Sequence, residues 1–509
     1  MREKALSYSR IVTLMILVIM IMGVIMPAFS APDPNIGRTL TGGAYGPCTW
    51  FIYLSSGANG NNIPIANAQV PGLSVNPGDN IIGTASQDIG AFVNSLITST
   101  NEHLCFDNGI FKVATTILYD ANVRGDHNFV ITGSGAGGCA PVIADCSAGQ
   151  EGGTYFLSTG ANPVIKILGI NGDPIDNPVV EYLTIDGGGF GSGTGDGALD
   201  CTTCYGGDFH DIRVMNSGNV GIYLTGSSGE QDKIHDCQVD DNHANGITLI
   251  LPTAVTRCDV WNNNSVAGLA CIQIAADRST VSYSTFDGTS KHGIFIGGAK
   301  YVHVTDNFVA NVGGLTTNTY DGIHIESASS YDVISGNTVV QDYGSVQTNK
   351  GRFGIGLSGD NSNLLIESNT IVGTFATSGG GSGGAGHIGF FVIPTAAVFT
   401  IVYRNNIGYD PFGMIVSPFA SSPNTMGPFG NSPGGTPLAS TVYNVILIDQ
   451  QLTCTGGTAT SITIKDSLGA TFVSGVSCTS NPVFYMSVGE TINFGAFTGT
   501  APTVSVLGM

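Results

Sequence analysis

Ionisable residues gather in one stretch of a chain that otherwise carries few of them. Lys, Arg, Asp and Glu make up only 11% of the 509 residues, less than half of the ~25% that is usual in globular domains. Between positions 291 and 352, however, basic, acidic and histidine side chains are concentrated. This candidate site consists of Lys291, His292, Asp321, His324, Glu326 and Arg352.

The carboxylates of the candidate site suit the hydrolysis of a glycosidic bond. A glycosidase needs two carboxyl groups, one protonated to assist the leaving group and one to activate water or attack carbon. Asp321 and Glu326 would supply this pair. His292 or His324 would then tune the protonation of the two carboxyls.

The cations of the candidate site suit a second chemistry, the cleavage of a polyuronate by elimination. A lyase needs positive charge to neutralise the sugar carboxylate and a base to take the C5 proton, and Arg352 and Lys291 would supply the charge. The formal net charge of −20 would repel a polyanion unless this basic patch or a bound Ca²⁺ intervened. Ca²⁺ is therefore the one cofactor we consider. With only 17 Lys and Arg in the chain, nucleic acid is excluded as a general partner.

A long-period repeat is the element that would bring these distant residues together. From about residue 199, apolar residues recur in two columns, with intervals of 22 to 33 in the first. The first column reads Leu199, Ile222, Ile247, Ile272, Ile294, Ile323, Ile355 and Ile388. The second column reads Val214, Val239, Val260, Phe286, Val309, Val339, Ile371 and Ile407. Such periods with two-residue alternation predict a stacked β-solenoid that buries its apolar columns at ~4.8 Å per rung.

A polar ladder accompanies the second column, two residues before each member from Val239 on. It consists of Cys237, Cys258, Ser284, Asn307, Asn337, Asn369 and Asn405. Stacked Asn amides bond to one another along the axis and secure a turn that is repeated in every coil. We expect Cys237 and Cys258 to stack as buried thiols.

Segments such as Ser335–Val339 and Glu367–Ile371, alternating with Gly-Ile strands, resemble the right-handed parallel β-helix of the pectin-lyase-like superfamily. The resemblance covers about residues 105–410 and implies an all-β solenoid. It does not imply one activity, because that fold carries lyases, hydrolases, epimerases, viral tailspikes and adhesins.

Two fragments of the repeat resemble motifs of the polygalacturonase family within this superfamily. Asn318–Ile325 is similar to its Asn-Thr-Asp-Gly-Ile-Asp-Ile with one extra Tyr, which maps a catalytic carboxylate onto Asp321. Lys291–Gly297 is similar to its Gly-His-Gly-Ile-Ser-Ile-Gly, which maps the family histidine onto His292. The order of the fragments is reversed, and the paired-Asp and Arg-Ile-Lys motifs are missing from this sequence, so polygalacturonase activity is not expected.

The predicted coils place the candidate site on one sheet face. Residues one position after the first-column anchors point to solvent by strand alternation. This outward row consists of Tyr223, Thr248, Gln273, Phe295, His324 and Gly356. His292 and Asp321 stand two positions before their anchors. Three consecutive coils would thus hold the candidate site within about two rung steps, ~10 Å.

Loops lengthen just ahead of the Gly-Ile strands in the later coils, at 310–321, 341–353 and 372–387. Successive loops on one edge make a wall, and a wall beside a flat sheet makes a groove, where function is commonly found. Side chains expected to contact a polysaccharide along this groove are Lys291, Tyr320, Asn245, Tyr223 and Lys350.

The first thirty residues are typical of a secretory signal. Arg2, Lys4 and Arg10 precede an apolar run over 11–26, and cleavage is expected after Ser30. The alternative is an uncleaved anchor, the one route by which the chain would contact a membrane. We therefore expect a secreted protein, or one held at the cell surface. Export permits disulfides among the eleven Cys, most economically between the two in Cys201–Cys204, and between Cys454 and Cys478.

Composition and patterning divide the rest of the chain into four parts. Residues 31–80 form an N-terminal β extension, and 81–410 form the β-helix, with an amphipathic helix within 87–98 as a lid over its open end. Residues 411–437, rich in Pro, Gly and Ser, are predicted to be a linker. Residues 438–509 are predicted to be a small β-sandwich-like module. The oligomeric state stays open.

Two functions remain in competition at this stage. In the first, the β-helix binds extracellular polysaccharide along the loop-walled face and cleaves it as a lyase or glycoside hydrolase. In the second, it is a non-catalytic surface protein, such as an adhesin or a tailspike-like binder. Whether Asp321, Glu326 and Arg352 converge in one groove separates the two.

Overall fold

The computed structural model describes most of the chain between Cys48 and Val372, and beyond it a set of strands. The described ranges are 48–56, 62–69, 80–84, 87–97, 102–124, 128–136, 153–169, 174–191, 196–226, 232–263, 268–316, 319–326, 328–341, 351–358 and 361–372, followed by strands that end at Gly508. The predicted signal segment, Lys350, Asn405 and the Cys454–Cys478 pairing lie outside what can be described.

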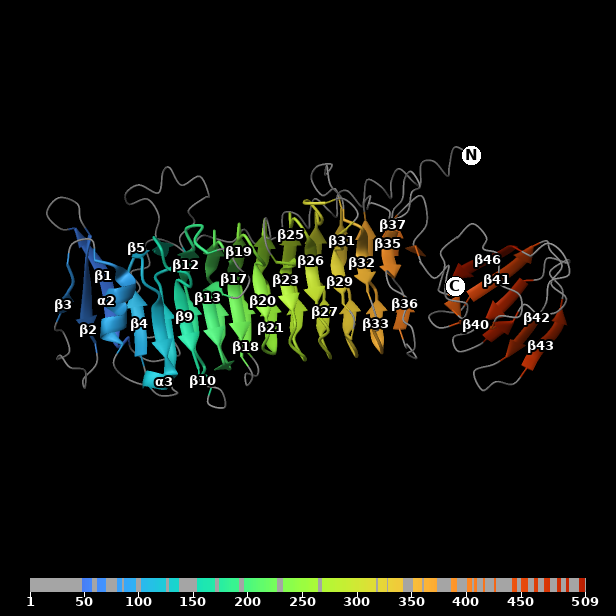
Figure 1. Ribbon diagram of the computed structural model, residues 1–509, viewed down its shortest axis with the longest axis horizontal. Helices are drawn as coiled ribbons and strands as arrows, with labels where there is room; N and C mark the ends of the chain where they lie inside the picture. The colour runs from blue at the N-terminus through green and yellow to red at the C-terminus, as the bar shows by residue number, and fades with distance from the viewer. Residues whose placement is uncertain are drawn as a thin grey trace, which may run out of the picture. The chain divides into compact units, whose positions relative to one another are not determined.

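Three long sheets, which we call A, B and C, run along the β-helix (Figure 1). Each coil contributes one strand to sheet C, then one to sheet A, then one to sheet B, and neighbouring strands from consecutive coils are parallel. The described strands therefore form the parallel β-helix that the repeat predicted.

Sheet C carries the first apolar column. Its strands, in spatial order, are β6 (Ile117–Asp120), β9 (Ile165–Leu168), β13 (Gly197–Thr202), β17 (Val220–Thr225), β20 (Ile247–Leu249), β23 (Ala270–Ile274), β26 (His292–Ile296), β29 (Ile323–Ile325), β32 (Phe353–Leu357), β35 (Gly386–Phe390) and β38 (Ile415–Val416). Every predicted first-column residue from Leu199 to Ile388 pairs with the next. The first-column register is confirmed.

Sheet B carries the second column. Its strands are β5 (Gly109–Val113), β8 (Thr154–Ser158), β12 (Leu183–Asp186), β16 (Arg213–Met215), β19 (Gln238–Asp240), β22 (Asp259–Trp261), β25 (Thr285–Asp287), β28 (Phe308–Ala310), β31 (Thr338–Val340), β34 (Thr370–Val372) and β37 (Ile407–Tyr409). The register is as predicted from Val214 to Ile371. The last member was wrong: Ile407 pairs with Thr370, and Gly408 takes the place beside Ile371, a one-residue shift from the predicted register.

Sheet A supplies a third apolar column that was not predicted. Its strands are β3 (Asn80–Ile82), β2 (Asn62–Ala68), β1 (Trp50–Ser56), β4 (Glu102–Phe106), β7 (Phe129–Thr132), β11 (Val179–Glu181), β15 (Asp208–His210), β18 (Asp232–His235), β21 (Thr253–Thr256), β24 (Thr280–Ser282), β27 (His303–Thr305), β30 (Val333–Ser335), β33 (Leu364–Glu367) and β36 (Ile401–Arg404). The column Ile234, Val255, Val281, Val304, Ile334 and Ile366 pairs in register and is fully buried. Short strands β10 (Ile175–Asp176) and β14 (Cys204–Tyr205) pair outside the three sheets, and α3 (Ala121–Arg124) follows β6.

The Asn ladder closes the turn between sheets A and B as expected. Asn307 Nδ2 donates to Asn337 Oδ1 at 3.0 Å, and Asn337 Nδ2 donates to Asn369 Oδ1 at 2.9 Å. Each Oδ1 also accepts a backbone N–H from the preceding coil, as in Asn307 N to Asn337 Oδ1 at 3.1 Å. Because these amides are buried and fully bonded, they fix the corner at every rung. Cys237 and Cys258, earlier in this ladder, are the expected buried free thiols.

The N-terminal end of the solenoid is covered by α2 (Ile89–Leu96), the expected lid. Asp88 caps this helix, and its carboxylate accepts the N–H groups of Gly90 and Ala91 at 3.2 Å, which satisfies donors that a helix start otherwise leaves free. The buried face of α2 packs on β5 and β6. Beside it, β2 pairs antiparallel with β1 and extends sheet A.

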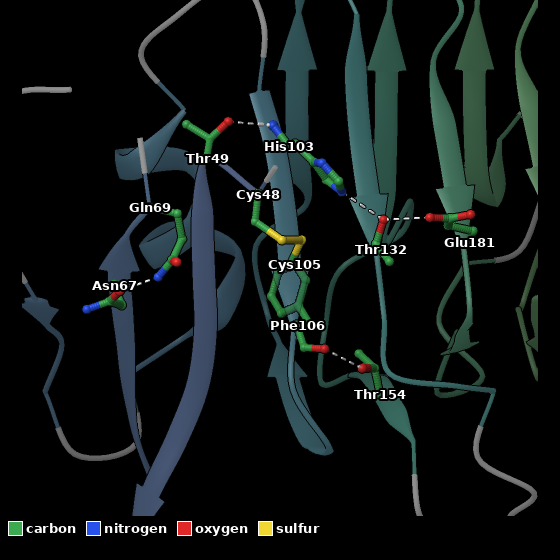
Figure 2. The surroundings of a disulfide bond; sticks show 10 residues. All are labelled: Cys48, Thr49, Asn67, Gln69, His103, Cys105, Phe106, Thr132, Thr154 and Glu181. Carbon is green, nitrogen blue, oxygen red and sulfur yellow. Dashed lines mark hydrogen bonds between the residues drawn. A yellow bond between two sulfur atoms is a disulfide. The ribbon is translucent and has the colours of Figure 1, made fainter. Parts of the chain in front are cut away.

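A disulfide that was not predicted joins Cys48, just before β1, to Cys105 in β4. Figure 2 shows it beside a chain of hydrogen bonds that crosses three strands of sheet A, from His103 Nε2 to Thr132 Oγ1 at 2.9 Å and on to Glu181 Oε1 at 2.8 Å. The predicted Cys201–Cys204 disulfide is present. Both bonds link neighbouring segments of the first coils.

Beyond the β-helix, strands form two further sheets. The first contains β39 (Thr425–Met426), β40 (Val442–Val445), β45 (Thr491–Asn493), β42 (Ile462–Lys465) and β43 (Thr471–Val476), and the second contains β44 (Val483–Met486), β41 (Gln450–Thr455) and β46 (Thr503–Gly508). Most of their pairings are antiparallel, which matches the expected C-terminal β module. Strands β38 and β39 fall within the range predicted to be a linker. In the part of the chain that can be searched, no helix has the length and apolarity to cross a bilayer.

Candidate active site

Three adjacent strands of sheet C position the candidate site. His292 begins β26, His324 lies at the centre of β29, and Arg352 immediately precedes β32. Asp321 lies where the chain enters β29, and its carbonyl accepts the N–H of Gly293 at 3.2 Å. The stacking of coils therefore brings these side chains together across about 60 residues of sequence, as the register predicted.

Asp321 is the centre of the cluster and is fully buried. Arg352 donates two hydrogen bonds to its carboxylate, from Nε to Oδ1 at 3.0 Å and from Nη2 to Oδ2 at 2.7 Å. His324 Nδ1 lies 2.6 Å from the same Oδ2. Burial by itself would raise the pKa of Asp321, but the hydrogen bonds from His324 and Arg352 outweigh it and hold the pKa below its ordinary value. Asp321 is therefore an ionised carboxylate that cannot reach a ligand.

Gly356 makes the space for that carboxylate. It is the residue of the outward row that follows His324 on the next coil. A Cβ atom at this position would lie 2.0 Å from Asp321 Oδ2, far inside van der Waals contact. The glycine is thus part of the construction of the site, because any side chain there would displace the carboxylate.

His292 lies beside Asp321 and His324 as an uncharged imidazole. Its Nδ1 accepts the backbone N–H of Asp321 at 2.9 Å, and its ring centroid is 4.5 Å from that of His324. Burial is the largest cause that lowers the pKa of His292, with the neighbouring His324 and Arg352 adding to it, and the pKa falls to about 3. His292 is uncharged at neutral pH, and Tyr320 packs edge-on against its ring at 5.2 Å.

The open side of the site lies at the other nitrogen of His324. Nε2 is 3.1 Å from Ser358 Oγ and 3.6 Å from Glu326 Oε2. Ser358 Oγ also lies 3.3 Å from Glu326 Oε1. The side chain of Glu326 is 45% exposed, so this edge is where the cluster meets solvent. The sequence interpretation did not single out Ser358, although it occupies the same position after β32 that Glu326 occupies after β29.

The outward row is more buried than alternation predicted. Thr248, Phe295 and His324 are only 3%, 7% and 5% exposed. Packing between coils explains why their exposure is lower than predicted. Rungs are ~4.8 Å apart, so large side chains at one column position cover each other: the Phe295 and His324 rings stack at 5.4 Å.

The residues predicted to contact substrate are only partly grouped with the cluster. Tyr320 packs on His292, and Tyr223 lies half-buried in the outward row. Asn245 is buried, and its amide bonds to Thr248, Gln273 and the backbone of the next coil, so it holds the sheet and is no ligand contact. Lys291 donates to the carbonyl of Gly268 at 2.7 Å.

A metal ion does not fit this cluster. Donor atoms of His292, Asp321 and His324 lie within 4.8 Å of one another. Both Asp321 oxygens, however, are occupied by Arg352 and His324, and a guanidinium at 2.7 Å repels a cation.

No protein-family model and no curated protein matches this chain. Similar solved structures include the A-module of a mannuronan C-5 epimerase from Azotobacter vinelandii, with 10% identity, a TM-score of 0.35 and coverage of 64% of this chain and 96% of that one. DFA-IIIase from Arthrobacter chlorophenolicus has 13% identity and a TM-score of 0.40, covering 64% and 91%. The Dettilon tailspike protein has 15% identity and a TM-score of 0.38, covering 64% and 58%. Scores of this size carry no argument about activity, and the fold rests on the strand register.

Proposed function

We propose that the protein binds an extracellular polysaccharide along the outer face of sheet C and transforms it by proton transfer at His324. One observation carries the proposal: His324 lies between an ionised, buried carboxylate at Nδ1 and, at Nε2, the hydroxyl of Ser358, which is 8% exposed, and the half-exposed carboxylate of Glu326. Asp321 holds the ring proton on Nδ1, so Nε2 is left as an acceptor at the open edge. A histidine held in this way is a general base.

The roles of the other members follow from what they contact. Asp321 orients His324, and Arg352 orients Asp321, so both are positioning residues. A role for Asp321 as one carboxyl of a glycosidase pair is disfavoured, because it is ionised and fully buried. Arg352 as the cation of a lyase is disfavoured too, since its Nε and Nη2 are engaged by Asp321. Glu326 is the carboxylate that reaches solvent.

A long, regular row of side chains supports an extended ligand. Successive pairings align Lys166, Asp200, Tyr223, Thr248, Gln273, Phe295 and His324 on sheet C. The rungs repeat every ~4.8 Å, and the partly exposed members of the row, Lys166, Tyr223 and Gln273, present an ammonium, a phenol and an amide group along it. Because the net charge is −20, a neutral polysaccharide suits this surface better than a polyuronate.

The rival function is a non-catalytic binder at the cell surface, and one observation favours it. His324 and Phe295 are only 5% and 7% exposed, so the face is closed enough to be a rigid scaffold. A secreted or surface location, proposed from the apolar segment over 11–26, suits both functions.

Binding and turnover, measured together, decide between the two. The full chain is run through gels that contain each of a panel of neutral and acidic polysaccharides, and products are sought by mass spectrometry. His324→Gln should keep binding and lose product, while His303→Gln, an exposed histidine on β27, should behave as wild type. Binding without any product from the wild type would favour the surface binder, and no binding to any polysaccharide would refute both.

A further inference from the structure

We propose that Ser358 is a nucleophile and that Ser358, His324 and Asp321 form a triad that hydrolyses O-acyl esters on the bound saccharide. The inference rests on the proposed function for its polysaccharide and names the bond that is broken. The substrate class is a sugar hydroxyl esterified with a short carboxylic acid such as acetate.

The geometry is that of an activated serine. Ser358 Oγ lies 3.1 Å from His324 Nε2, and His324 Nδ1 lies 2.6 Å from Asp321 Oδ2. Nucleophile, base and orienting carboxylate need separations of about 2.6–3.2 Å, and both distances lie in that range. Triads occur on unrelated folds and are recognised by geometry and roles, not by sequence order.

The three groups are held by rigid structure on two neighbouring coils. Ser358 follows β32 and donates its N–H to Ile325 O at 2.9 Å, while its carbonyl accepts Asn361 Nδ2 at 3.0 Å. His324 lies within β29, packed between the rings of His292 and Phe295. A catalytic group on a strand keeps its position better than one on a loop, which holds for His324, while the two backbone hydrogen bonds of Ser358 fix the serine just after β32.

Glu326 is the competitor for the serine proton. Its Oε1 is 3.3 Å from Ser358 Oγ, slightly farther than His324 Nε2, and its side chain is 45% exposed. Because the Glu326 side chain is half-exposed, it can turn to solvent, where water replaces the serine hydroxyl as its hydrogen-bond donor. In the triad, His324 Nε2 therefore receives the serine proton, and Glu326 stays outside the proton transfer.

The reaction balances with water as the only co-reactant. Ser358 Oγ bonds to the acyl carbon as its proton passes to His324 Nε2. The bond from that carbon to the sugar oxygen then breaks, and the sugar oxygen takes the proton from Nε2. Water next attacks the acyl-serine, giving one proton to Nε2, and the bond to Ser358 Oγ breaks as the serine recovers that proton. The products are the free sugar hydroxyl and one carboxylic acid.

Two measurements on the full chain test the triad. In the first, the wild type is treated with a fluorophosphonate, from which an activated serine displaces fluoride, and the adduct is located by peptide mass spectrometry. In the second, acetate release is followed from p-nitrophenyl acetate and from acetylated xylan. The variant is Ser358→Ala, with Ser282→Ala on β24 of sheet A as the matched serine control.

We expect one phosphonate on Ser358 in the wild type and in Ser282→Ala. Ser358→Ala should form no adduct. Its rate of ester hydrolysis should fall by at least roughly 1,000-fold, as it does when a triad serine is removed. Its melting temperature should not change. Ser282→Ala should also retain wild-type ester hydrolysis. No adduct at Ser358 together with no ester hydrolysis by the wild type would overturn the triad, and so would full activity of Ser358→Ala. Polysaccharide binding is scored separately: binding without deacylation refutes only the triad, and deacylation of the small ester without binding refutes only the polysaccharide proposal.

Discussion

A Cβ atom on Gly356 would lie 2.0 Å from Oδ2 of Asp321, although the two residues belong to different coils. Because Gly356 has no side chain, the carboxylate of Asp321 on the preceding coil can reach His324. Substitutions at Gly356, Asp321 or Arg352 therefore act on both stability and the reaction, and matched control variants separate the two effects.

Gly356→Ala should displace the Asp321 carboxylate from His324. The methyl group overpacks a filled site, which typically costs about 1–3 kcal/mol, and turnover should fall by more than the loss of folded protein explains. The measurements are the melting temperature and the rate of product release. Gly314→Ala is the control, because a Cβ there meets its nearest neighbour, Thr289 O, at an ordinary 3.5 Å. Wild-type turnover in Gly356→Ala would contradict the assigned role of the carboxylate.

Asp321→Asn should destabilise the fold as well as slow the reaction. It removes the carboxylate that faces a buried guanidinium, and breaking a buried ion pair typically costs about 3–5 kcal/mol. Arg352→Met should cost a similar amount for the converse reason. The double variant should cost clearly less than the sum, which urea unfolding of all four proteins would measure. Strict additivity would show that the pair does not interact.

Two buried acids should make the protein less stable as pH rises from about 4 to 7. Burial raises the pKa of Asp232 to about 7 and that of Asp332 to about 7, and one oxygen of each accepts only a backbone N–H, from Gly207 and Val302. The folded state then keeps protons that the unfolded state has released, so the free energy of unfolding falls with pH. Asp232→Asn with Asp332→Asn should flatten the curve, measured by denaturant unfolding across that range. A curve unchanged by both substitutions would contradict the assignment.

His210 should carry charge well above neutral pH. Burial would lower its pKa, but Glu181, Asp211 and Asp208 outweigh that and raise it to about 9; Nε2 is 3.1 Å from Glu181 and Nδ1 is 2.9 Å from Asp211. The stabilisation is complete below the ordinary histidine pKa and is lost as pH rises through about 9. Titration of the ring by NMR would locate the midpoint. Glu181→Gln should move it down, and a midpoint that stays in place would show that Glu181 is not responsible.

The sequence alone was sufficient to determine the register of the coils from Leu199 to Ile388. The period aligns Ile294, Ile323 and Ile355, and a one-residue slip would turn this apolar column to solvent. The same logic placed His292, Asp321, His324 and Arg352 side by side. It failed at Ile407, where the neighbouring Gly408 removes the contrast between the two faces, and it missed the column of sheet A.

Only the tertiary structure decided what those residues can do. Asp321 precedes a glycine, as an ordinary turn aspartate does. In the folded protein it is buried, and its hydrogen bonds to Arg352 and His324 keep it ionised and fixed in position. Ser358 resembles any loop serine until stacking on the preceding coil places its hydroxyl 3.1 Å from His324 Nε2. Protonation and hydrogen-bond direction depend on the distance to groups some thirty residues away, and those distances are set by side-chain packing between coils, which no local pattern encodes.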